Sequence, residues 1–150
     1  MLNKLPPNEK AYEAFSAIAD GRVAMHEDYA HITSSDHSKV YEVRWQDHVY
    51  YSTDSATYWQ GYPGYPVIAV LMEQGKLPHD RQAESLLKNI SWKQLNDKHK
   101  RNYQAAAEEV FQSLKDNGID PQPTIQLAHQ VNESLAGLDI EVKRGKKLHD

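Results

Sequence analysis

A chain of 150 residues without cysteine excludes disulfide bonds, thiolate metal sites and cysteine nucleophiles. Its formal charge of −4 differs from the strongly basic balance of many nucleic-acid-binding domains. No apolar run approaches the roughly 20 residues needed to cross a bilayer, and the N-terminus lacks the apolar stretch of a signal peptide. We therefore expect a single cytoplasmic domain over residues 1–150, with no membrane segment.

The first segment, residues 1–21, is expected to form one short helix. Asn8 can accept hydrogen bonds from the free N–H groups of the first turn. Tyr12 and Phe15 are three positions apart, which places them on one face of the helix. Gly21 is typical of the position just after a helix.

Residues 22–53 are rich in β-branched and aromatic side chains and predict a small, mostly antiparallel sheet. Four short strands are expected, in the sequences "RVAMH", "YAHITS", "KVYEVRW" and "HVYYST". The third alternates most clearly, with Tyr41, Val43 and Trp45 on one side. The turn formers in "SSDHS" and "QDH" are expected to connect the second strand to the third and the third to the fourth.

Residues 54–137 are the expected helical part of the domain. Asp54 or Ser55 can cap one helical turn after the last strand. Pro66 fits the first position of the next helix, and Gly75 fits its end. The intervening "VIAVLMEQ" is apolar on nearly every side, so this helix is predicted to be buried against the sheet.

Three further helices are predicted before a charged tail, residues 138–150. A short one is capped near residues 79–80, a long one covers about residues 92–117, and the last begins at Asp120–Pro121. We expect the tail to be loosely held beyond about Val142. The predicted fold class is α+β: an N-terminal helix, the sheet, then three or four helices packed against it.

The stretch "GYPGYP", residues 61–66, is the main candidate for a binding site. Trp59, Tyr62, Gly64 and Tyr65 are the predicted ligand-binding residues, because their rings can line a pocket above the N–H groups that begin the buried helix. The same stretch is also explained as a tight turn, in which Gly64 supplies backbone freedom and the tyrosines pack. We expect Tyr62 and Tyr65 to be half-exposed at the edge of a shallow pocket.

Two histidines near the sheet, His26 and His31, are candidate metal ligands together with Glu27 and Asp28. On one continuous strand, positions 26 and 31 point to opposite faces, and only a turn at 27–28 would bring them together. The chain has no HExxH, HxH or other spaced metal motif. We therefore predict surface histidines, with no metal and no other cofactor.

His48, Ser52 and Asp54 suggest an enzymatic alternative, because on one strand all three would point to the same side. This alternative is a small hydrolase that uses His48 and Asp54, with or without a metal ion. The chain has no GxSxG motif, however, and Ser52 and Asp54 are also residues that cap a helix after a strand.

Two basic clusters leave nucleic-acid binding as a weaker alternative. They are "KQLNDKHKR", which starts at Lys93, and "KRGKK", residues 143–147. In the first, Lys93, Asp97 and Arg101 follow one another at i,i+4 spacing, which is typical of a solvated helix face. The second belongs to the charged tail, so nucleic acid is not the expected partner.

The function predicted from the sequence is that of a small, soluble, non-enzymatic binding or regulatory protein. Its binding surface would be formed by the aromatic residues near the sheet and the loop over residues 59–66. The expected partner is a protein or a small-molecule ligand, because no catalytic spacing is recognised.

Overall fold

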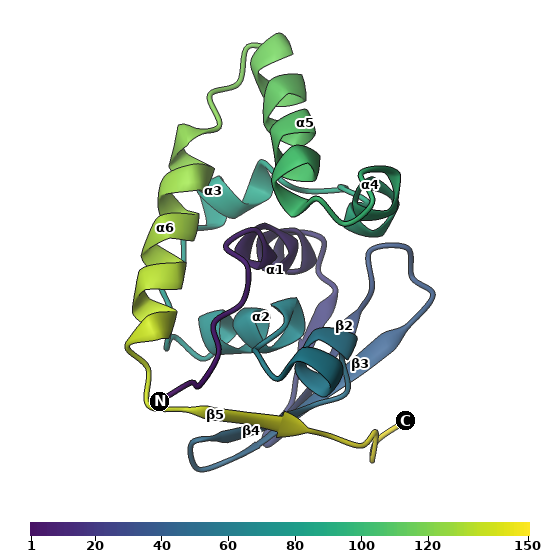
Figure 1. The fold of residues 1–150 in the computed structure, drawn as a ribbon, viewed down its shortest axis with the longest axis vertical. Helices are drawn as coiled ribbons and strands as arrows, with labels where there is room; N and C mark the ends of the chain where they lie inside the picture. The colour runs from purple at the N-terminus through teal and green to yellow at the C-terminus, as the bar shows by residue number, and fades with distance from the viewer.

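The computed structural model describes residues 1–150 and has the predicted α+β class. Five strands form one sheet, and helices α1 to α6 lie on one side of it (Figure 1). The elements follow one another as α1 (Lys10–Ala19), β1 (Val23–Met25), β2 (Tyr29–Thr33), β3 (Val40–Gln46), β4 (Val49–Ser52), the short π-helix η1 (Ala56–Gln60), α2 (Tyr65–Glu73), α3 (Arg81–Ser85), α4 (Trp92–Lys98), α5 (Tyr103–Asp116), α6 (Gln122–Ala136) and β5 (Glu141–Arg144). None of the helices has both the length and the apolar character that a bilayer crossing requires.

The sheet has the strand order β1–β2–β3–β4–β5. Its first four strands form an antiparallel meander, which confirms the four predicted strands, and β5 pairs parallel to β4. Ala30, Ile32 and Val43 lie on the face that meets the helices and are fully buried. One face of the sheet therefore carries the core, as in other sheets covered by helices on one side.

Helix α2 is the centre of the core. Every residue from Pro66 to Met72 is buried, as expected for a helix without a polar face. It packs on β1, β3 and β4 on one side and on α1 on the other, so the two helices are stacked over the sheet (Figure 1). Pro66 occupies the second helical position rather than the predicted first, because Gly64 is the residue that precedes the helix. Burying one aliphatic side chain of this kind contributes about 1.5–3 kcal/mol.

Helix α1 is buried along almost its whole length, including several polar side chains. The Ser16 hydroxyl donates to the Leu87 carbonyl oxygen at 2.6 Å and accepts from the Trp92 indole N–H at 2.7 Å, so its burial leaves no polar atom unpaired. Gly21 follows the helix with φ of 70°, as predicted. The predicted cap at Asn8 is wrong, because no side chain caps the first turn.

The single long helix predicted over residues 92–117 is wrong. The chain forms α4 and α5 instead, and Lys100 and Arg101 between them adopt left-handed φ values of 54° and 66°. Asn102 then begins α5, its side-chain oxygen accepting the Ala105 N–H at 3.1 Å. Lysine and arginine are good helix formers, so their propensity gives no sign of this break. The break places Arg101 at a bend rather than on a regular helix face.

The C-terminal tail, predicted to be loose beyond about Val142, is instead ordered by the sheet. After β5, the Gly145 N–H donates to the Ser52 carbonyl oxygen at 2.9 Å. Gly145 lies so close to the β4 backbone that a Cβ at this position would collide with it. One valine among charged residues gives β5 no strand pattern of its own, so pairing with β4 is what forms this strand.

Beyond β5 the tail meets Glu42 on the outer face of the sheet. The N–H groups of Leu148 and His149 donate to the Glu42 carboxylate at 2.9 and 3.0 Å, and His31 Nε2 lies 2.8 Å from Glu42 Oε1. The carboxylate is buried, since Glu42 is only 1% exposed. Burial alone would raise the pKa of this carboxyl, but these hydrogen bonds outweigh burial and lower the pKa to about 2.

This arrangement predicts a pH dependence of stability. The folded-state pKa of Glu42 lies below its ordinary value of 4.5, so its carboxylate contributes stability that is fully present above that value and lost as the pH falls towards about 2. Urea denaturation of the wild-type protein and of Glu42→Gln should show a wild-type advantage near neutral pH that shrinks at about pH 3. An equal difference between the two proteins at both pH values would contradict this assignment.

Candidate functional site

Three adjoining hollows surround the start of η1, and Ser55 lines all three. Together they are called the Ser55 groove. The outer hollow has a volume of about 590 Å³, the inner hollow about 290 Å³ and the side hollow about 460 Å³. Small-molecule sites in proteins typically have volumes of roughly 300–1,000 Å³, so the groove has a suitable size.

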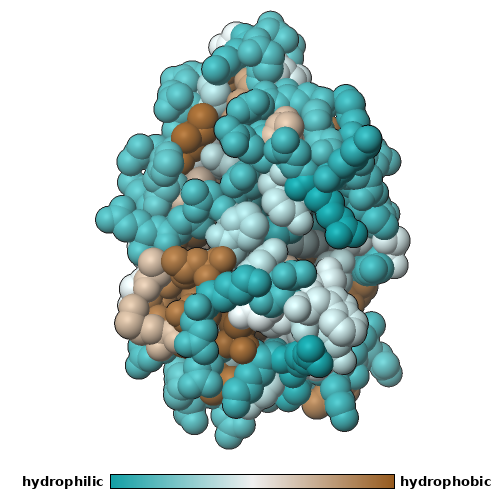
Figure 2. Space-filling view, viewed as in Figure 1, coloured by the Kyte–Doolittle hydropathy of each residue, from teal (hydrophilic) through white to brown (hydrophobic).

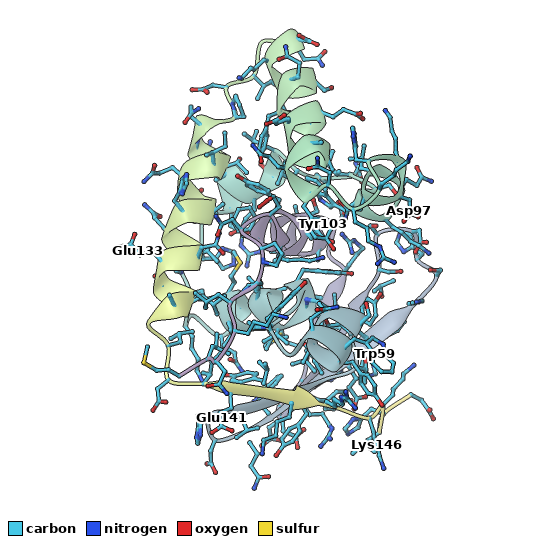
Figure 3. All side chains as sticks on the ribbon, viewed as in Figure 1. Trp59, Asp97, Tyr103, Glu133, Glu141 and Lys146 are labelled. Atoms are coloured by element: carbon cyan, nitrogen blue, oxygen red, sulfur yellow. The ribbon has the colours of Figure 1, made fainter.

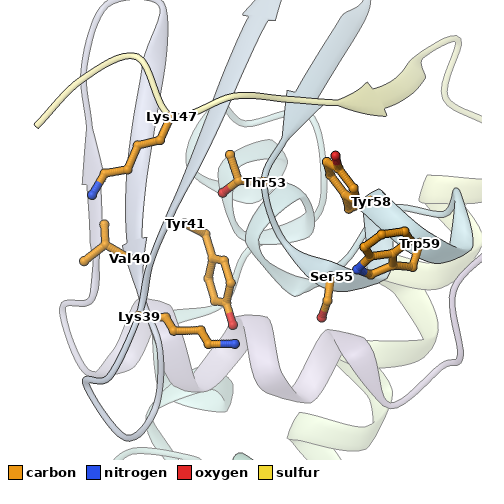
Figure 4. Close-up of a pocket in the computed structure, with 8 residues that line it drawn as sticks. All are labelled: Lys39, Val40, Tyr41, Thr53, Ser55, Tyr58, Trp59 and Lys147. Carbon is orange, nitrogen blue, oxygen red and sulfur yellow. The ribbon is translucent and has the colours of Figure 1, made fainter.

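The outer hollow lies between the start of β3, the residues that follow β4, and η1. It is lined by Lys39, Val40, Tyr41, Thr53, Ser55, Tyr58, Trp59 and Lys147. Tyr41 stands on one side, Tyr58 and Trp59 stand on the other, and Ser55 lies between them (Figure 4). Trp59 is 69% exposed, so its ring is open to a ligand. This hollow therefore presents aromatic side chains on two sides.

The inner hollow lies between α1, the sheet and α4. It is lined by Glu13, Arg22, Ser34, Ser35, Lys39, Tyr41, Ser55, Tyr65, Trp92, Lys93 and Arg101. Glu13 is its one acidic residue, and this side chain is almost buried, with 11% of its surface exposed. The rings of Tyr41 and Tyr65 meet at a right angle with their centres 6.2 Å apart. The inner hollow has more charged residues in its lining than either of the other two.

The side hollow lies between η1, α1 and the start of α5, on the face where Figure 3 labels Trp59 and Tyr103. It is lined by Lys10, Ser55, Ala56, Trp59, Gln60, Tyr62, Arg101 and Tyr103. Lys10 Nζ lies 3.2 Å from Glu13 Oε2 and 4.4 Å from the centre of the Tyr103 ring. The Lys10–Glu13 ion pair therefore stands between the side hollow and the inner hollow.

The groove is basic, although the whole chain has a net charge of −4. Its basic residues are Lys10, Arg22, Lys39, Lys93, Arg101 and Lys147. Half of these are in ion pairs, namely Lys10 with Glu13, Arg22 with Asp20 and Lys93 with Asp36. Lys39, Arg101 and Lys147 have no acidic partner, so their charge is available to an anion in the groove.

The groove is also aromatic. Half of the Trp, Tyr and Phe residues of the chain line it: Tyr41, Tyr58, Trp59, Tyr62, Tyr65, Trp92 and Tyr103. Arg144 of β5 lies over the rings of Tyr58 and Trp59, 4.8 and 5.5 Å from their centres, and its Nε donates to the Tyr58 carbonyl oxygen at 2.8 Å. These contacts hold η1 and its rings against the sheet. Figure 2 shows the surface over η1 as pale, between hydrophilic and hydrophobic.

Burial shifts the acidity of the ionisable groups in the groove. Burial raises the pKa of Glu13, and the nearby Lys10 offsets only part of that rise. Burial lowers the pKa of Lys10, but the charges of Glu13 and Tyr103 outweigh it, so this pKa is raised. Burial also raises the pKa of Tyr41 and of Tyr65. At neutral pH these tyrosines are therefore hydroxyl donors, and Lys10 is a cation.

Three of the four predicted ligand-binding residues line the groove. Trp59 borders the outer and side hollows, Tyr62 the side hollow and Tyr65 the inner hollow. Tyr65 is partly exposed, as expected. The prediction that Tyr62 is half-exposed is wrong, because this residue is only 8% exposed. Lys4 Nζ lies 5.4 Å from the centre of its ring.

The fourth predicted residue, Gly64, lies behind the groove and has a packing role. Its φ of −75° and ψ of 175° are ordinary extended values, so the prediction that it supplies special backbone freedom is wrong. A Cβ at this position would collide with the Asp54 carboxylate. That carboxylate is fixed by the Ser52 hydroxyl and by the Thr57 N–H, which donates to it at 3.0 Å. Glycine is therefore required here for space.

The two residues of the hydrolase alternative lie at opposite ends of β4. His48 precedes the strand and pairs with Glu141 of β5, with 3.6 Å between Nε2 and Oε1. Asp54 follows the strand, is 4% exposed and accepts from Ser52 and Thr57. The structure therefore gives each of them a different partner and does not bring them together.

Two of the four candidate metal ligands, His26 and His31, come close together, because the chain turns at residues 27–28. The rings of His26 and His31 have their centres 6.2 Å apart. Tyr29 stacks on His26 at 4.4 Å and on His149 at 3.6 Å. No three or more His, Asp or Glu side chains gather in a way that could hold a metal ion.

Most other groove residues were not assigned to the site from the sequence, and four charged ones are instructive: Lys10, Glu13, Arg101 and Lys147. Lys10 and Glu13 are charged residues three positions apart on a helix whose other buried side chains are mostly apolar. Such a pair in a buried helix is the one sequence feature that indicates a site here. Arg101 reaches the groove through the break between α4 and α5. Lys147 lies at the groove because β5 pairs with β4. Neither the helix break nor this strand pairing has a recognisable pattern in the nearby sequence.

The packing of Gly64 predicts that Gly64→Ala destabilises the fold by about 1–3 kcal/mol, the range for forcing a methyl group into filled space. Gly137→Ala is a matched control, because Gly137 also has an ordinary φ, of −96°, and has room for a Cβ. Urea denaturation measures both variants. Equal stability of the two would show that the contact with Asp54 carries no strain.

Comparison with known proteins finds a family model, described as Uncharacterised conserved protein UCP014422, that matches residues 3–141. This range includes every residue that lines the Ser55 groove except Lys147. No curated protein and no solved structure matches the chain. Because the family model covers nearly the whole chain and contains both the sheet meander and the helices, this protein belongs to the family Uncharacterised conserved protein UCP014422.

Proposed function

We propose that the protein is a binding protein whose Ser55 groove holds a small organic anion that joins a planar ring to a phosphate or carboxylate group. The observation that carries the proposal is the lining of the groove. In a chain of net charge −4, half of the aromatic residues and six basic residues line adjoining hollows. Aromatic faces bind planar groups by stacking, and cations bind the anionic end through charge-assisted hydrogen bonds.

The planar ring of the ligand would bind in the outer hollow. Tyr41 and Trp59 stand on opposite sides of this hollow, and the ring of Trp59 is exposed (Figure 4). Arg144 braces the Trp59 ring from β5, which reduces the conformational entropy lost when a ligand stacks on it. Stacking of a base on an aromatic side chain contributes about 1–3 kcal/mol, so a ring at this place would add substantially to affinity.

The anionic end of the ligand would bind in the inner hollow. Lys39 lines both the outer and the inner hollow, and Arg101 lines both the inner and the side hollow. Neither has an acidic partner, so neither loses an ion pair when it binds an anion. The hydroxyls of Tyr41 and Tyr65 are further donors, because burial keeps both protonated. Two cations and two hydroxyls therefore converge on one enclosed space.

A small ligand fits the groove better than a large partner does. The three adjoining hollows have volumes close to the size range of small-molecule sites. A stable protein–protein interface usually buries at least roughly 1,200 Å² of surface, most of it outside hollows of this kind. An acidic chain is repelled by a long phosphate backbone, whereas a single anion meets only the local positive charge of the groove.

Titration with adenosine monophosphate, adenosine and inorganic phosphate tests this proposal. We expect the nucleotide, which carries both a ring and a phosphate, to bind more tightly than either half and to quench the fluorescence of Trp59. Trp59→Ala should weaken binding by about 5- to 100-fold, the equivalent of one stacked ring, while Trp59→Phe keeps most of the affinity. Arg101→Gln should also weaken binding, and Lys115→Gln, which removes the same charge from an exposed site outside the groove, should not.

Two results would contradict the proposal. One is that none of the three probes binds at millimolar concentration in low salt, where electrostatic attraction is least screened. The other is that a mixed single-stranded oligonucleotide binds far more tightly than the mononucleotide, with a steep dependence on salt. That result would favour nucleic-acid binding instead.

Acid–base catalysis on the bound ligand is a second candidate function, and Glu13 is the residue that favours it. Its carboxyl group lines the inner hollow, its pKa is raised by burial, and Lys10 stands 3.2 Å away. A carboxyl with a raised pKa inside a cleft is a common general acid or base. The partner of Glu13 in this arrangement is Lys10 rather than His48, so the candidate differs from the hydrolase predicted from the sequence.

A screen of phosphate and carboxylate esters with purified protein tests the second candidate. If Glu13 transfers the proton, Glu13→Gln should lower turnover by about 100-fold or more and leave the binding of adenosine monophosphate within about twofold. Full turnover in Glu13→Gln would overturn this role. So would a wild-type protein that binds the nucleotide but turns over no ester in the screen.

A further inference from the structure

Glu42 lies outside the Ser55 groove, yet its contacts hold the segment that carries a groove residue. We propose that Glu42 is a positioning residue of the groove: it fastens the C-terminal tail, residues 145–149, so that Lys147 faces the outer hollow. This inference rests on the proposed function, because it concerns the affinity of the same groove for an anion. Glu42 is next to Tyr41 in β3, so its side chain lies on the opposite face of the strand from this groove residue.

The Glu42 carboxylate is the main anchor of the tail. Its Oε2 accepts the Leu148 N–H at 2.9 Å, and its Oε1 accepts the His149 N–H at 3.0 Å. His149 Nδ1 lies 3.2 Å from Oε2, and His31 Nε2 lies 2.8 Å from Oε1. Both carboxylate oxygens are thus bonded to the tail. Hydrogen bonds to an ionised acceptor are roughly twice as strong as neutral ones, so this anchor is a strong one.

Apolar burial does little to hold this part of the tail. Leu148 is 61% exposed, and Lys147 is exposed as well. The other contacts are the Gly145 N–H bond to Ser52 and the stacking of His149 on Tyr29. A segment held by a few polar contacts rather than by a buried side chain can be released by a single substitution.

Lys147 lies between the two anchored points of the tail. Gly145 is bonded to β4 on one side of it, and Leu148 is bonded to Glu42 on β3 on the other. With both ends held, the Lys147 side chain lies beside Val40 at the edge of the outer hollow, which both residues line (Figure 4). Lys147 is one of the three groove cations without an acidic partner, so release of the tail would remove positive charge from the site. Glu42 therefore acts on the ligand through Lys147.

Amide hydrogen exchange, followed by NMR without any ligand, tests the anchor itself. The Leu148 and His149 amides should exchange slowly in the wild-type protein and at least about tenfold faster in Glu42→Gln, whose neutral amide is a weaker acceptor. Leu148→Pro removes one donor from the tail side, and Leu148→Ala keeps that donor and is the matched control. These tail variants leave β3 intact, so they also serve if Glu42→Gln folds poorly.

A double-mutant cycle tests the effect on the groove. Glu42→Gln and Lys147→Ala should each weaken the binding of adenosine monophosphate by about fivefold, the size expected for one exposed cation that lies near the ring in the outer hollow. Together they should weaken it no further than Lys147→Ala alone, because both remove the same contact. A merely structural effect of Glu42→Gln would instead weaken binding by the same factor in both backgrounds.

The possible results separate this inference from the proposed function. Unchanged exchange at Leu148 and His149 in Glu42→Gln would overturn the anchor, whatever the ligand does. Faster exchange with unchanged affinity, for a nucleotide whose binding Trp59→Ala does weaken, would overturn the link to the groove and leave the proposed function standing. If the wild-type protein binds none of the probes, both the proposed function and the link between Glu42 and the groove are contradicted. Faster exchange at Leu148 and His149 in Glu42→Gln, together with a double mutant that binds no more weakly than Lys147→Ala alone, would support both the anchor and its effect on the groove.

Discussion

The buried carboxylate of Asp54 is the contact on which the arrangement of the groove depends. It accepts the Ser52 hydroxyl at the end of β4 and the Thr57 N–H in the first turn of η1, and it packs directly on Gly64 before α2. One side chain therefore sets how the sheet, η1 and the buried helix lie relative to one another. Because Asp54 is only 4% exposed, loss of the carboxylate would leave buried donors unpaired, which is costly. The Ser55 groove opens directly beside this junction.

The charges at the edge of the core fit a binding site better than they fit a stabilising role. The stacked pair α1 and α2 buries apolar side chains over the sheet, but Lys10 and Glu13 on α1 are almost buried as well. A buried ion pair contributes little net stability, since the desolvation of both groups offsets their attraction. This pair lines two hollows of the groove, with the Lys10 ammonium over the Tyr103 ring. We propose that this pair serves the anion-binding role of the groove, since it lines both the inner and the side hollow.

Sequence patterns predict those elements whose formation depends on residues close together in the chain. The strand meander follows from alternation and turn formers, and the burial of α2 follows from its lack of a polar face. The break at Lys100 and Arg101 was missed because both residues favour a continuous helix, and β5 was missed because its partner lies about 90 positions earlier in the chain. Both features place residues in the groove, so the part of the site that depends on them is not predicted from the sequence either. Trp59, Tyr62 and Tyr65 were found from aromatic content, whereas Arg101 and Lys147 depend on tertiary contacts.

We propose that the Ser55 groove binds a small anion carrying a planar ring. An NMR map of backbone amide and Trp indole shifts during titration with adenosine monophosphate would locate that binding directly. We expect the shifted signals to cluster at Tyr41, Ser55, Trp59 and Arg101, which come from β3, the start of η1, η1 itself and the bend before α5. Shifts gathered on α6 or on the outer end of α5, with those four residues unchanged, would contradict it.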